Sequence, residues 1–72
     1  MTPTEKAVQL FNTYYVSILG INNDLSEEII ISILAKKHAL IAVTEIINIY
    51  INFPKHPQSI YWQEVKQEIE KL

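Results

Sequence analysis

The stretch KKHALIAV, residues 36–43, decides the fold of this chain. It opens with two lysines and a histidine, and the five residues that follow are all apolar, with no polar face among them. It lies inside a run from Ile29 to Phe53 that is otherwise mostly apolar. The isoleucine-rich ends of this run also suit a strand, but the alanines and leucines in its middle favour a helix. We therefore predict a helix over about residues 26–51 whose apolar part must be buried.

The N-terminal segment carries the signals of a helix start. Thr2 can cap a helix, and Glu5, three residues later, completes a capping box with it. Pro3 suits the first helical position, and Gly20, the only glycine, suits a left-handed C-terminal cap. We predict a helix over about residues 3–19, whose apolar stripe consists of Ala7, Leu10, Phe11, Tyr14 and Ile18.

Two further boundaries divide the chain. A polar turn follows the first helix, and Asp24 or Ser26 can cap the second. Residues 53–58 form a loop, because two prolines there exclude a continuing helix. Ser59 can cap a third helix over about residues 60–72, and its apolar stripe is Trp62, Val65, Ile69 and Leu72. The predicted fold is all-α, a single domain over residues 1–72 that forms a small antiparallel bundle of three helices.

The size of the chain predicts that the bundle is completed by oligomerisation. At 72 residues and 49% hydrophobic content, a lone core leaves much apolar surface in water. Disulfides are excluded because there is no cysteine, and His38 and His56 are too few for a histidine-based structural zinc. We expect no metal and no cofactor, and a homo-oligomer.

Charge and motifs exclude several classes of function. The net charge is −2 and the six cations are all lysines, which predicts no binding to nucleic acid. Lys36, Lys37, His38 and Glu45 interrupt the apolar run, and each is costly in hydrocarbon, so we expect a cytoplasmic protein without membrane contact. The sequence contains no phosphate-binding glycine loop and no nucleophile motif, so we expect no enzyme and no catalytic residue.

The basic step Lys36-Lys37-His38 is the first candidate site. Lysine charge with an imidazole hydrogen bond would suit an anion such as phosphate. The alternative is a solvated edge, where Lys36 and Lys37 extend to water from a buried helix and His38 is half exposed. Both interpretations stay open on the residues alone.

The tyrosines are the second set of candidates. Tyr14 and Tyr15 point about 100° apart on a helix, so both cannot enter one core. Tyr14 belongs to the apolar stripe, and Tyr15, with Asn12 nearby, therefore faces a partner, a pocket or water. Stacking on a purine and packing at an interface are both open. On the third helix we expect Trp62 in the core and Tyr61 free to border a pocket.

One face of the predicted third helix carries carboxylates. Glu64, Glu68 and Lys71 are spaced by four and three residues. A carboxylate site could use this spacing, but it is also the ordinary pattern of ion pairs within a helix, which we favour.

Several segments together resemble a known group of proteins. They are MTPTEKA at residues 1–7, Tyr14-Tyr15, ALIAVTEII at residues 39–47 and YWQEVKQEIEKL at residues 61–72. The combination is similar to short, uncharacterised helical proteins of Bacteroidetes phages and prophages. The chain departs from that group at Thr44, where aspartate is usual, and at His38, where cysteine is common. The cysteine-to-histidine exchange argues against an essential catalytic role at position 38.

The resemblance implies a setting rather than an activity. In size, oligomeric need and aromatic-plus-lysine content the chain looks similar to phage sponge proteins that sequester nucleotide immune signals. The hypothesis is that a cyclic nucleotide or ADP-ribose derivative binds between protomers in the bacterial host: tyrosine stacks on the base, lysine holds phosphate, and histidine or asparagine bonds ribose. The alternative is an adaptor or inhibitor that turns its apolar helix face toward a host protein. The candidate ligand-binding residues are Asn12, Tyr14, Tyr15, Lys36, Lys37, His38 and Tyr61.

Overall fold

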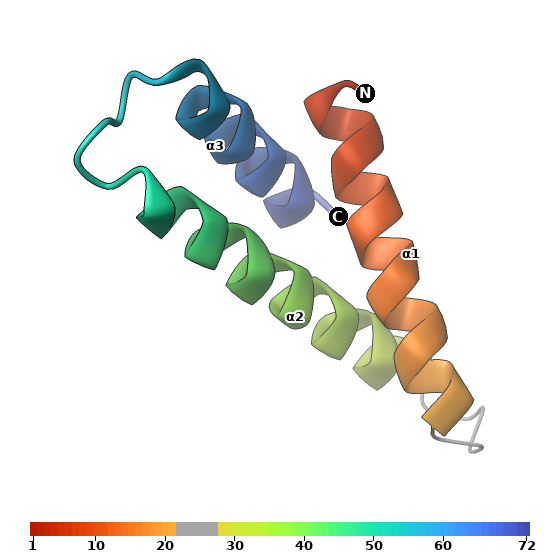
Figure 1. Ribbon diagram of the computed structural model, residues 1–72. Helices are drawn as coiled ribbons and strands as arrows, with labels where there is room; N and C mark the ends of the chain where they lie inside the picture. The colour runs from red at the N-terminus through yellow and green to blue at the C-terminus, as the bar shows by residue number, and fades with distance from the viewer. Residues whose placement is uncertain (22–27) are drawn as a thin grey trace.

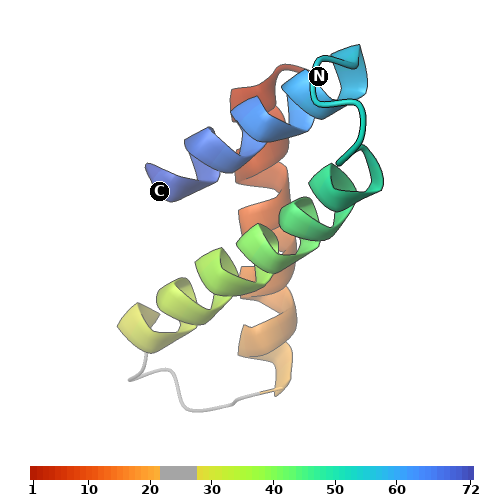
Figure 2. The same cartoon turned by 90° about the vertical axis from the view of Figure 1, so that its left-hand side faces the viewer.

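The computed structural model describes residues 1–21 and 28–72, which fold into three α-helices. They are α1 (Pro3–Ile21), α2 (Glu28–Ile49) and α3 (Pro57–Glu70), and each packs against the other two. α2 and α3 run antiparallel side by side, and α1 crosses both of them (Figures 1 and 2). The prediction of an all-α bundle of three helices is confirmed, and the predicted oligomerisation stays a prediction.

The two ends of α1 differ in how well the sequence predicted them. The capping box is present: the Glu5 amide donates to Thr2 Oγ1 at 3.1 Å, and the Thr2 amide donates to Glu5 Oε1 at 3.0 Å. The bond from the Thr2 amide lowers the pKa of Glu5, because it stabilises the charged carboxylate. The predicted left-handed cap at Gly20 is wrong, since α1 continues to Ile21 and Gly20 does not have a positive φ. The proposed caps of α2 at Asp24 and Ser26 lie outside the described residues.

The core lies where the three helices meet. α2 contributes a buried stripe of every fourth residue, in which two alanines allow its neighbours to approach closely. This inner stripe is Ile31, Ala35, Ala39 and Val43. The central cluster joins Ala7 of α1 and Val65 and Ile69 of α3 to the Ala39–Val43 end of the stripe. Around it pack the half-buried side chains of Leu10, Tyr14, Leu40, Ile47, Tyr61 and Trp62.

α3 begins one turn earlier than predicted, at Pro57 rather than Ile60. The predicted cap at Ser59 is wrong: His56 is the cap, and its Nδ1 accepts a hydrogen bond from the Gln58 amide at 3.1 Å. Pro57 fits the first helical position because its missing N–H would have had no helical partner there. A proline therefore marks the beginning of this helix and not the loop before it.

Ser59 and Leu72 show the effect of this shift. Ser59 is buried inside the first turn of α3, where its Oγ accepts a hydrogen bond from Gln63 Nε2 at 2.9 Å. Leu72, predicted for the apolar stripe, lies beyond the end of α3 at Glu70 and is exposed. The rest of the predicted stripe packs as expected.

The bundle is elongated and exposes more surface than its mass predicts. Its extents are 43 × 19 × 16 Å. Its accessible surface is 5076 Å². A monomer of this mass is expected to expose about 4,600 Å². In the described part of the chain, no helix is long and apolar enough to cross a membrane.

Candidate functional site

The three side chains of the basic step Lys36-Lys37-His38 on α2 have different surroundings. Lys36 is half buried, and its Nζ donates a hydrogen bond to the backbone carbonyl of Glu70 at 2.8 Å. Glu70 is the last residue of α3, where the free carbonyl groups carry partial negative charge. Lys36 therefore fastens α2 to the end of α3.

Lys37 lies on the side of α2 that faces away from the other two helices. Successive helical residues point about 100° apart, so its side chain diverges from that of Lys36. Large apolar side chains share this side: Ile30 is 51% exposed, Ile33 60%, Leu34 37% and Ile41 51%. We call this surface the outer face of α2 and define it as Ile30, Ile33, Leu34, Lys37, Ile41 and Glu45. It lies opposite the buried inner stripe.

His38 lies at the edge of the outer face and meets α1. Its ring contacts the ring of Tyr14 edge to face, with the centroids 5.9 Å apart. Together they line an open pocket of about 340 Å³, whose other walls are Ile41, Ala42 and Glu45. Ile41 and Glu45 belong to both the pocket and the outer face, so the pocket opens onto that face. The carboxylate of Glu45 disfavours a phosphate in this pocket, because like charges repel.

Three pocket residues were missed by the sequence interpretation. Ile41, Ala42 and Glu45 follow His38 by three, four and seven residues. This spacing places all of them on one side of a helix. This helical spacing after His38 is the signal in the sequence that could have identified them.

The remaining candidate residues do not line the pocket. Asn12 is exposed on α1, and the ring of Tyr15 packs against Phe11 one turn away, with the centroids 5.9 Å apart. The hydroxyl of Tyr61 donates to the backbone carbonyl of Met1 at 3.1 Å, and its ring contacts Trp62. Tyr61 therefore holds the N-terminus against α3. Of the seven candidates, Tyr14 and His38 are the two brought together at the pocket.

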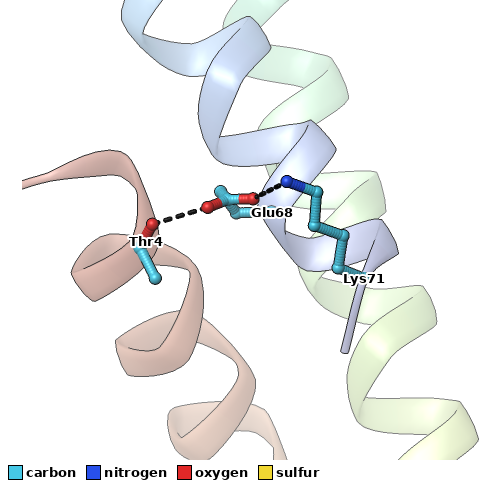
Figure 3. A network of polar contacts seen from close by, with 3 residues as sticks. All are labelled: Thr4, Glu68 and Lys71. Atoms are coloured by element: carbon cyan, nitrogen blue, oxygen red, sulfur yellow. Dashed lines mark hydrogen bonds and ion pairs between the residues drawn. The ribbon is translucent and has the colours of Figure 1, made fainter.

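A polar network joins α1 to α3 (Figure 3). Thr4 Oγ1 donates a hydrogen bond to Glu68 Oε1 at 2.6 Å, and Lys71 Nζ lies 2.7 Å from Glu68 Oε2. The hydrogen bond from Lys71, followed by that from Thr4, lowers the pKa of Glu68. The pair Glu68–Lys71 confirms the predicted ion pairing within the third helix.

A second pocket surrounds this network. It measures about 410 Å³ and is lined by Pro3, Thr4, Glu64, Gln67, Glu68 and Lys71. Its central carboxylate is already satisfied by Thr4 and Lys71. The network therefore connects the beginning of α1 to the end of α3.

Among residues 1–21 and 28–72, no three histidine, cysteine or carboxylate side chains form a group that could hold a metal ion. Comparison with protein-family models, curated proteins and solved structures finds no match to this chain.

Proposed function

We propose that this chain is a non-enzymatic binding protein that acts as a dimer of identical chains, assembled through the outer face of α2. The observation that supports this is the exposure of Ile30, Ile33, Leu34 and Ile41 on one side of a helix whose opposite side is the core. Burying one such side chain fully contributes about 1.5–3 kcal/mol. These side chains are already partly buried, so each contributes about half of that figure. Counted over both copies, their total is of the same order as the cost of association.

A second copy is the occupant that the charges of this face favour. The outer face carries one cation, Lys37, and one anion, Glu45, with Ile41 midway between them. A surface with one charge of each sign is complementary to a copy of itself.

The test is to remove two apolar side chains from the outer face. Ile33→Ser/Ile41→Ser should convert the wild-type dimer to a monomer in analytical ultracentrifugation, without loss of helical circular dichroism. The matched control is Val16→Ser/Ile60→Ser, which removes exposed apolar side chains from α1 and α3 and should leave the dimer intact. A wild type that stays monomeric at about a millimolar contradicts the proposal and favours the alternative of an adaptor that binds a host protein.

The pocket supports a second candidate function, sequestration of a nucleotide-derived immune signal. Tyr14 and His38, both candidates from the sequence, line one pocket, and an aromatic ring beside an imidazole suits stacking and hydrogen bonding with a base or ribose. Lys36 is engaged with α3 and Lys37 does not line the pocket, so this candidate rests on recognition of the base and ribose.

Calorimetry tests this candidate with a panel of cyclic nucleotides and ADP-ribose derivatives. Binding of one of them that Tyr14→Ala and His38→Ala each weaken by at least about tenfold, equal to about 1.4 kcal/mol, supports sequestration. Tyr15→Ala is the matched control, since Tyr15 does not line the pocket. Absence of heat with every compound at about a millimolar protein contradicts it.

A further inference from the structure

We propose that the two copies pair antiparallel along α2, about a two-fold axis at Ile41, so that Lys37 of each copy lies level with the partner's Glu45. This inference rests on the proposed dimer through the outer face of α2 and specifies its register and its orientation.

The spacing of the charges supports the axis. Lys37 comes four residues before Ile41, and Glu45 comes four residues after it. With a rise of about 1.5 Å per residue, each charge lies about 6 Å from Ile41 along the helix. In an antiparallel pair centred on Ile41, position 37 of one helix is therefore level with position 45 of the other. A two-fold axis repeats this contact, so two oppositely charged pairs flank one apolar contact.

Two other ways of pairing the same face bring like charges together. In a parallel pair in register, Lys37 meets a second lysine and Glu45 meets a second glutamate. An antiparallel pair centred near Lys37 also brings the two lysines together. Like charges at an interface are unfavourable, so of these three arrangements the charges favour the antiparallel pair centred on Ile41.

The unpaired state of these charges in the single chain agrees with this role. The structure gives neither Lys37 nor Glu45 an ion pair with another described residue. By contrast, Lys36 is bonded to α3 and Lys71 to Glu68. The two charges on the outer face are thus available to a partner.

The pairing also completes the pocket. Ile41 and Glu45 are pocket walls, so a second α2 that packs on Ile41 covers the open side of the pocket. The partner's Lys37 then lies beside Glu45 and offsets its negative charge. The two-fold axis passes midway between the two helices and perpendicular to both. It therefore places both pockets on the same side of the dimer. A ligand bound in either pocket would contact both copies.

A charge swap tests the register. Lys37→Glu and Glu45→Lys should each raise the dimer dissociation constant by at least about tenfold, since each places like charges level with one another. The double variant restores opposite charges and should return the constant to within about threefold of wild type. Analytical ultracentrifugation measures all four proteins, and circular dichroism checks that each is folded. Lys55→Glu, a charge change in the loop after α2, is the control and should leave the constant unchanged.

The outcomes separate the register from the dimer itself. If both single variants weaken the dimer and the double variant is as weak as either, or if neither single variant has an effect, the register is wrong while the proposed dimer stands. If the wild type does not associate, or associates as tightly with Ile33→Ser/Ile41→Ser, the proposed dimer itself is wrong.

Discussion

The two sides of α2 are both apolar, yet they have opposite surroundings. The inner stripe consists of Ile31, Ala35, Ala39 and Val43, all buried by the chain's own helices. The outer face carries larger side chains, among them Ile33 and Ile41, and these remain in water. The two alanines of the inner stripe let the neighbouring helices approach, whereas the isoleucines of the outer face are left exposed by the described residues. The difference shows that the hydrophobic content of α2 exceeds what three helices can bury.

Ile31 and Ile33, two residues apart on α2, should give the largest difference in stability between the two sides. Ile31→Ala removes a fully buried side chain and should destabilise the fold by about 2–5 kcal/mol. Ile33→Ala, at an exposed position, should change the stability of the monomer by about 0.5 kcal/mol or less. Urea unfolding measures the loss of stability in both variants, at a protein concentration below the dimer dissociation constant so that the monomer is observed. Equal losses would show that the outer face is packed against something within the chain.

Two alanines one turn apart test how closely the inner stripe is packed. Ala39 is fully buried, so Ala39→Leu should force α1 and α3 apart and cost about 1–3 kcal/mol. Ala42 lines the open pocket, where added atoms have room, so Ala42→Leu should cost less than about 1 kcal/mol. Thermal unfolding of the two variants compares them. A greater loss at Ala42 would contradict the packing described.

The adjacent residues Lys36 and Lys37 have different roles. Lys36 bonds to α3 within the chain, whereas Lys37 is proposed to contact the second copy. Lys36→Ala removes the hydrogen bond to the last carbonyl of α3 and should cost about 0.5–1 kcal/mol. Lys37→Ala leaves the monomer's stability nearly unchanged and instead weakens the dimer. Urea unfolding of the monomer and sedimentation of the dimer measure the two effects. The interpretation is wrong if Lys36→Ala weakens the dimer while Lys37→Ala destabilises the monomer.

Acid should produce the smallest effect, because the carboxylates concerned are at the surface. The pKa of Glu68 is lower in the folded chain than its ordinary value of 4.5. The unfolded chain therefore binds the proton first, and this contribution to stability is present above pH 4.5 and lost as pH falls through the lowered pKa. Glu68→Gln should flatten the fall in stability over that range. Unfolding curves between neutral and acidic pH measure the slope.

Local signals were the part of the fold that the sequence predicted well. The capping box of Thr2 and Glu5 and the pair Glu68–Lys71 each join residues three positions apart. The helical stripes of α1 and α3 likewise depend on spacings within two turns. Such features follow from helix geometry alone, whatever the rest of the chain does.

The sequence did not predict the features that distant residues or competing signals decide. Lys36 finds its partner 34 positions later at Glu70, and Tyr61 finds Met1 60 positions earlier. No local pattern specifies such contacts, and the prediction that both residues contact a ligand stays a prediction. Gly20 was predicted as a cap from its residue type, but its helix continues by one residue. In α2 the apolar residues extend around the helix, so periodicity could not distinguish the inner stripe from the outer face.

A single cysteine at the proposed axis tests the central claim most directly. The chain has no cysteine of its own, so Ile41→Cys introduces one thiol per copy. If two copies pair through the outer face of α2 about Ile41, the two thiols lie opposite one another and mild oxidation should give a disulfide-linked dimer in high yield. Val16→Cys, at an exposed position on α1, should form little disulfide-linked dimer under the same conditions. Equal cross-linking at both positions, or none at position 41, would contradict the account.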